Sequence, residues 1–91
     1  MNVFNTGDLV KSLCGRDCGK VFCVISLKDD VHCLIADGKY RRLDNPKLKK
    51  FKHLQKVGVV AEGLVEKLEK GNVIFDAELN KAIRQVIRDD E

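Results

Sequence analysis

The seven residues Val21-Phe22-Cys23-Val24-Ile25-Ser26-Leu27 constrain the fold of this chain most strongly. They are rich in β-branched and aromatic side chains, which favours a strand. Alternate residues of a strand point to opposite faces, and here both faces are apolar. The sequence therefore predicts a strand that is covered on both sides, so that a second layer must pack against its sheet.

Four further runs resemble short strands, and turns of two to six residues separate them. The predicted strands are residues 8–14, 21–27, 31–36, 39–43 and about 53–57. Asp37-Gly38 predicts a type I′ hairpin turn into the strand 39–43, and the basic residues 47–52 then form a loop. Five short strands within about fifty residues favour a small antiparallel barrel over a βαβ fold.

After residue 59 the apolar period becomes helical. Val60, Leu64, Val65 and Leu68 predict a helix over residues 60–70 that Gly71 ends. Asp76 is a suitable N-cap for a second helix ending near residue 88, with Glu78 in its first turn. The second helix carries one apolar stripe, formed by Leu79, Ile83, Val86 and Ile87. We expect both helices to cover the barrel, giving a single domain of residues 1–91 with a barrel at 7–57 and an extension at 58–91.

Charge is distributed unevenly along the chain. Residues 1–56 hold twelve Lys and Arg against six Asp, whereas residues 57–91 hold five Lys and Arg against eight Asp and Glu. The asymmetry indicates an anionic partner for the first part. The chain has no apolar run of membrane-spanning length and its first residues do not resemble a signal peptide, so we expect a cytoplasmic protein without a membrane partner.

The four cysteines, Cys14, Cys18, Cys23 and Cys33, have poor spacing for a metal site. Cys23 and Cys33 fall within predicted strands, where a free cysteine usually behaves as a small buried hydrophobe. A tetrahedral site that includes His32 is the less favoured alternative. We therefore predict no metal and no cofactor, and no residue spacing indicates a catalytic nucleophile.

Gly15-Arg16-Asp17-Cys18-Gly19-Lys20 predicts a sharp turn between the first two strands, with φ > 0 at a glycine. Such a loop can bring backbone N–H groups and cations close to phosphates. Its spacing differs from that of a nucleotide-binding P-loop, and a strand follows it instead of a helix.

A second basic segment follows the third strand. Seven cations lie between Arg41 and Lys56, opposed only by Asp44, with Tyr40, Phe51 and His53 interleaved as stacking groups. A solvated charged face is the alternative interpretation. Together with the glycine loop, this segment gives the candidate RNA-binding residues Arg16, Gly19, Lys20, Lys39, Tyr40, Arg41, Arg42, Lys47, Lys49, Lys50, Lys52 and His53.

Three segments, residues 7–12, 15–24 and Ala36-Asp37-Gly38, resemble a KOW motif in their residues and in their spacing along the chain. The stretch from Gly7 to about Leu54 is similar to bacterial KOW-domain RNA-binding proteins related to the fourteen-e protein of the archaeal and eukaryotic large ribosomal subunit. The resemblance implies an SH3-like barrel, no catalysis, and ribosomal or other structured RNA as ligand. It also implies that Gly19 matches the KOW glycine and that the surrounding loop and basic strand edge face RNA.

The alternative function is a protein-interaction barrel of the SH3 or Tudor kind, associated with the transcription or translation machinery. Such barrels build grooves or cages from several aromatic residues, whereas this chain has four Phe, one Tyr and no Trp. The scarcity of aromatic residues favours RNA. Ribosome-associated proteins are a further class of partner, and we expect a monomer.

Overall fold

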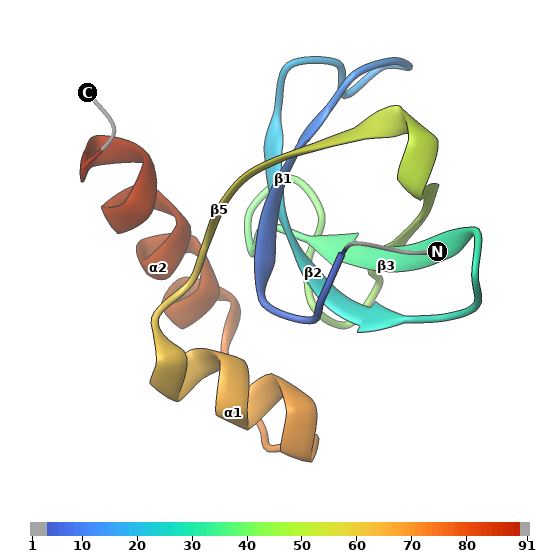
Figure 1. The fold of residues 1–91 in the computed structure, drawn as a ribbon. Coiled ribbons are helices and arrows are strands. Elements are labelled where there is room, and N and C mark those ends of the chain that lie inside the picture. Colours follow the sequence, from blue (N-terminus) through green and yellow to red (C-terminus); the bar gives the residue numbers. More distant parts are fainter. Residues whose placement is uncertain (1–3, 90–91) are drawn as a thin grey trace.

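The computed structural model describes residues 4–89, which form one five-stranded antiparallel sheet and two helices (Figure 1). The spatial order of the strands is β4-β3-β2-β1-β5. The strands are β1 (Asp8–Ser12), β2 (Val21–Leu27), β3 (His32–Ala36), β4 (Lys47–Lys50) and β5 (Leu54–Val59). This confirms the prediction of a mainly β chain with five antiparallel strands and two C-terminal helices.

The sheet must curl strongly. Strands β4 and β5 follow each other in sequence, yet they form its opposite edges. Only the 3₁₀ turn η1 (Phe51–His53) separates them. Five strands in a flat sheet would place the edges about 19 Å apart, whereas four residues of chain reach at most about 14 Å. The Phe51 N–H donates to Val31 O (2.9 Å) and the Leu13 N–H donates to His53 O (2.9 Å), which holds η1 across the gap. Within the described residues no ladder joins β4 to β5, so the sheet is not closed.

The fourth strand lies later in the sequence than predicted. Residues 39–43 belong to an irregular loop, and the segment 47–50, expected to be a loop, is strand β4. The type I′ turn was also wrong, because it needs φ > 0 at two residues and only Gly38 (φ 78°) has it. The cause is Asp37, whose carboxylate accepts hydrogen bonds from the N–H groups of Lys39 and Arg41 and closes the chain on itself.

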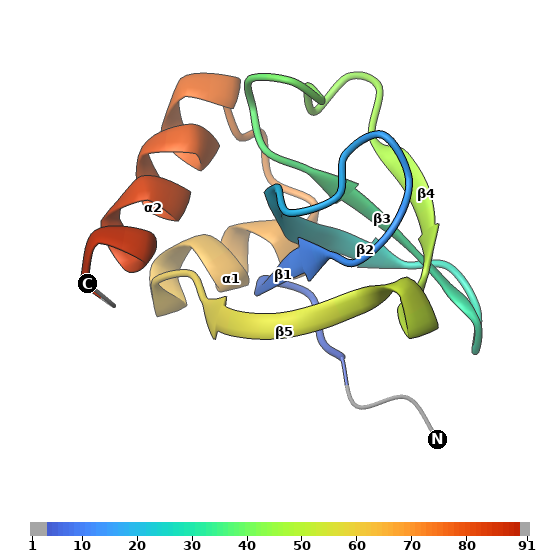
Figure 2. The same ribbon diagram turned by 90° about the horizontal axis from the view of Figure 1, so that it is seen from above.

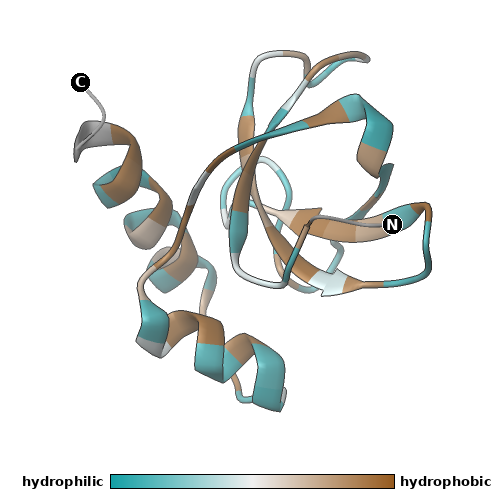
Figure 3. Cartoon of the chain, in the orientation of Figure 1, coloured by the Kyte–Doolittle hydropathy of each residue, from teal (hydrophilic) through white to brown (hydrophobic). Residues whose placement is uncertain are grey.

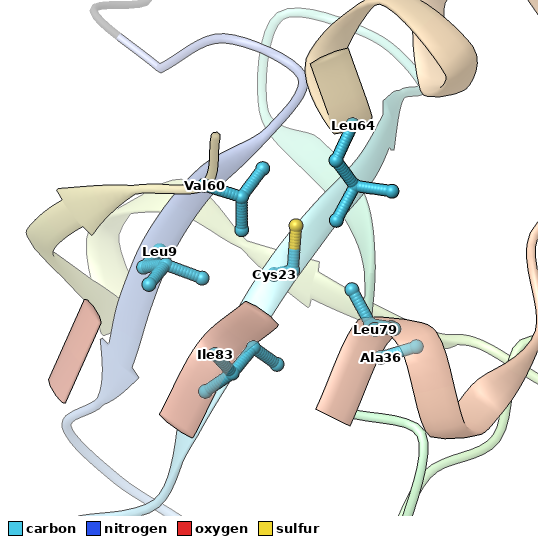
Figure 4. Packing of buried hydrophobic residues seen from close by; sticks show 7 residues of the cluster. All are labelled: Leu9, Cys23, Ala36, Val60, Leu64, Leu79 and Ile83. Carbon is cyan, nitrogen blue, oxygen red and sulfur yellow. The ribbon is translucent and has the colours of Figure 1, made fainter. Parts of the chain in front are cut away.

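Both faces of the sheet are buried, as predicted. One face packs against the helices through a cluster that Figure 4 shows: Leu9, Cys23, Ala36, Val60, Leu64, Leu79 and Ile83. The inner face of the curl holds a second cluster: Val10, Phe22, Val24, Cys33, Ile35 and Leu54. Neighbouring residues such as Cys23 and Val24 thus serve different cores, and apolar colour runs along β2 and β3 in Figure 3. This double burial explains why both faces of the run 21–27 are apolar.

Helices α1 (Glu62–Lys70) and α2 (Asp76–Asp89) lie on the same side of the sheet (Figures 1 and 2). Gly71 ends α1 in the left-handed conformation (φ 72°), as predicted. The buried stripe of α2 contains Leu79 and Ile83, also as predicted. The N-cap prediction for Asp76 was wrong, because Leu79 N–H bonds to Phe75 O and Asp76 is the first helical residue. Its carboxylate binds the loop after β3 instead.

Candidate nucleic-acid interface

The β1–β2 loop, residues 13–20, bends at two glycines with positive φ, Gly15 (90°) and Gly19 (88°). The N–H groups at its C-terminal end are used in internal hydrogen bonds. Those of Cys18, Gly19 and Lys20 donate to the backbone oxygens of Gly15, Ser12 and Asp17, respectively. The side chains of Arg16 and Lys20 on this loop are exposed, so a phosphate that approaches the loop can meet both.

Asp17 anchors this loop from within. Its carboxylate accepts hydrogen bonds from Ser12 Oγ (2.7 Å), Lys47 Nζ (2.7 Å) and Lys49 Nζ (3.1 Å). Burial alone would raise the pKa of Asp17, but the hydrogen bonds from Lys47, Ser12 and Lys49 outweigh it and hold the pKa well below its usual range. The loop is thus tied to strand β4 by a buried charge cluster.

The β3–β4 loop, residues 37–46, is organised by a second buried aspartate. Asp37 Oδ1 accepts from Lys39 N (2.9 Å) and Arg41 N (2.8 Å), while Asp37 N and Gly38 N both donate to Arg41 O. These bonds fix the backbone on both sides of Tyr40. The side chain of Tyr40 is nevertheless 65% exposed.

Helix α2 holds the β3–β4 loop from outside. Asp76 accepts from Leu43 N (2.7 Å) and from Arg42 Nε (3.2 Å), and Asn80 Nδ2 donates to Asp37 O (3.2 Å). Gly38 lies so close to the backbone oxygen of Asp76 that a Cβ at this position would overlap it. Figure 2 shows this loop, in green, against the N-terminal end of α2. The acidic helical part of the chain therefore positions the basic loop.

The two loops face each other across an open pocket of about 210 Å³. Residues distant in sequence line it: Arg16, Asp17, Lys20, Phe22, Tyr40, Arg41 and Lys47. Lys20 places its Nζ 3.8 Å from the centroid of the Tyr40 ring, and Lys39 Nζ lies 5.4 Å from the same centroid. Two cations thus lie against one exposed aromatic ring, and Arg16, Arg41 and Lys47 line the same pocket. The one carboxylate of the pocket, Asp17, is already paired with Lys47 and Lys49.

The structure brings five of the twelve predicted site residues into this pocket, with Lys39 and Arg42 adjacent on the same loop. Lys49 is only 8% exposed and donates to Asp17 and Cys14 O, so it stabilises the fold and is turned away from an external ligand. Gly19 borders a different hollow, which has apolar walls. Lys50, Lys52 and His53 lie at the far end of β4 and in η1, outside the pocket.

Sequence reasoning missed the residues that position the pocket. A local signal existed for Asp37, since an aspartate before glycine often accepts the N–H two residues later. Asp17, Asp76 and Asn80 gave no such signal, because the partners that tie them to other elements are 30 or more residues away in sequence.

The cysteines divide into two exposed and two buried thiols. Burial, with the charge of Asp8, raises the pKa of Cys23 to about 12, and burial raises the pKa of Cys33 to about 11. The prediction that both are buried hydrophobes is confirmed, and a raised pKa makes them unreactive. In the part of the chain that the structure describes, no three His, Cys, Asp or Glu side chains are grouped so as to hold a metal ion.

Comparison with known proteins gives no relative: no family model matches the chain, and neither does any curated protein. Within residues 4–89, neither helix combines the length and apolar character that crossing a membrane requires.

Proposed function

We propose that this protein is a non-catalytic RNA-binding protein of the KOW type, with its curled sheet equivalent to an SH3-like barrel, and that it binds structured RNA, ribosomal RNA in particular. The observation that carries the proposal is the pocket between the β1–β2 and β3–β4 loops. There Arg16 and Lys20 of one loop and Arg41 of the other line the same pocket as the exposed Tyr40, although the two loops are far apart in sequence.

The positive charge and the exposed position of this pocket favour RNA as its ligand. Phosphates supply most of the affinity of RNA-binding proteins, and the arginines can in addition grip phosphates with two hydrogen bonds. Lys39 and Arg42 extend the positive surface along the β3–β4 loop, and Lys50 and Lys52 add a second exposed basic group at the far end of β4. A Tudor-like cage for a cationic ligand fits less well, because two lysines, Lys20 and Lys39, already lie against the Tyr40 ring.

The test is RNA binding across a salt series, with total cellular RNA and isolated ribosomal subunits as ligands. If four of these cations each neutralise one phosphate, log K against log salt should have a slope of about −3 on single-stranded RNA. Arg16→Glu/Lys20→Glu should weaken binding and lower the slope to about −1.4, because two of the four contacts are lost.

The matched control is Lys81→Glu/Arg84→Glu, which makes the same charge change on exposed positions of α2. It should bind almost as the wild type does. Failure of the wild type to retain RNA at low salt would refute the proposal, as would equal losses in the two double variants, since general charge would then explain them. The double variant Lys50→Glu/Lys52→Glu measures how much the second basic group contributes to RNA binding.

A further inference from the structure

The backbone on both sides of the exposed Tyr40 is held by hydrogen bonds. The N–H groups of both its neighbours, Lys39 and Arg41, donate to the same carboxylate oxygen of Asp37, which is itself 5% exposed. Helix α2 fixes the same loop through Asp76 and Asn80. The ring is therefore presented to solvent on a fixed backbone, which lowers the entropy lost when a ligand packs on it.

Lys20 approaches this ring from the other loop. Its Nζ lies 3.8 Å from the ring centroid, and Arg16 and Arg41 line the same pocket. A ligand group that stacks on this face of Tyr40 would displace Lys20 Nζ from the ring and would then lie beside several cations. A planar ring joined to an anionic group is the ligand chemistry that matches this arrangement, and a nucleotide has both.

The size of the pocket limits what can enter. Its volume of about 210 Å³ is below the roughly 300 to 1,000 Å³ of sites for drug-sized molecules, so it suits one ring and an adjoining phosphate. In an RNA duplex the faces of the bases are stacked on each other, and side chains cannot read the deep major groove. Tyr40 can stack only on a base that has left the helix.

We infer that this pocket binds one unpaired nucleotide of a structured RNA, with its base stacked on Tyr40 and its phosphates held by Arg16, Lys20 and Arg41. The inference rests on the proposed RNA-binding function and specifies the form of RNA that the site selects. Bulges, loops and splayed ends meet the requirement, whereas a continuous duplex does not.

The experiment compares two RNA hairpins that differ only in one bulged uridine. Wild-type protein should bind the bulged hairpin more tightly, and Tyr40→Ala should weaken that binding about 5- to 150-fold, because one stacked base contributes that much. Tyr40→Phe keeps the stacking ring and should bind nearly as the wild type does. Binding of the hairpin without a bulge should change little in either variant.

A second measurement uses unmodified protein. Tyr40 is the single tyrosine of the chain, and there is no tryptophan, so tyrosine fluorescence reports on this pocket alone. Titration with the bulged hairpin should quench it, and the hairpin without a bulge should quench it much less. Equal binding and equal quenching by both hairpins, with Tyr40→Ala unaffected, would overturn the inference and leave the proposed function standing. No binding of either hairpin at low salt would refute both.

Discussion

The two loops that form the pocket are each built around one buried aspartate, but the two aspartates act on different partners. Asp17 accepts hydrogen bonds from side chains, namely those of Ser12, Lys47 and Lys49. Asp37 accepts from backbone N–H groups of its own loop. One loop is thus held by charges on a neighbouring strand, and the other by its own backbone and by helix α2.

This difference shows what each half of the chain contributes. Two lysines of the basic segment, Lys47 and Lys49, hold the β1–β2 loop, so not every cation of that segment is available to a ligand. The acidic helical half holds the β3–β4 loop through Asp76, which gives the C-terminal helices a role in the site. We therefore expect the conformation of the β1–β2 loop to depend on charge and pH, and that of the β3–β4 loop to depend on its contact with α2.

Removing the Asp17 carboxylate should have the largest effect. Asp17→Ala leaves Lys49, which is 8% exposed, without its counter-ion, and breaking a buried pair in this way costs about 3 to 5 kcal/mol. Urea denaturation followed by circular dichroism measures the loss. The double variant Asp17→Ala/Lys49→Met removes both charges and should recover much of that stability. A loss below about 1 kcal/mol in the single variant would show that Asp17 does not anchor the loop.

Acidification should also weaken the contribution of Asp17, but it should lower the free energy of unfolding by less than Asp17→Ala does. The pKa of Asp17 is lower in the folded chain than in the unfolded chain, so its contribution is complete above about pH 5 and is lost as the pH falls below about 4. The difference in free energy of unfolding between the wild type and Asp17→Asn should therefore shrink on acidification. Two exposed carboxylates with lowered pKa, Asp29 and Glu78, are present in both proteins and cancel in this difference. A difference that is constant with pH would contradict the anchoring role.

Much of the fold followed from local patterns. The double-faced run 21–27 predicted both the sheet and its helical cover, and Gly71 correctly marked the end of α1. The error at residues 39–43 arose because side-chain hydrogen bonds to the backbone overrode the apparent strand pattern. For the candidate site, charge and aromatic content predicted which cations and which tyrosine to consider. Which of these cations lie together depends on pairings across 30 or more residues, as Lys47 and Lys49 with Asp17 illustrate.

The smallest effect on stability, and the one most specific to the second loop, is expected for Asp76→Ala. It removes the acceptor of Leu43 N–H at a partly exposed position, which costs about 1 kcal/mol. Glu78→Ala is the matched control, because it also removes an acidic residue from the first turn of α2 but loses only a surface pair with Lys67. Amide hydrogen exchange of Lys39 and Arg41 should become faster in Asp76→Ala and not in Glu78→Ala. RNA affinity should fall more in Asp76→Ala than in Glu78→Ala. Equal exchange in the two variants would show that the Asp76 carboxylate does not shape this loop.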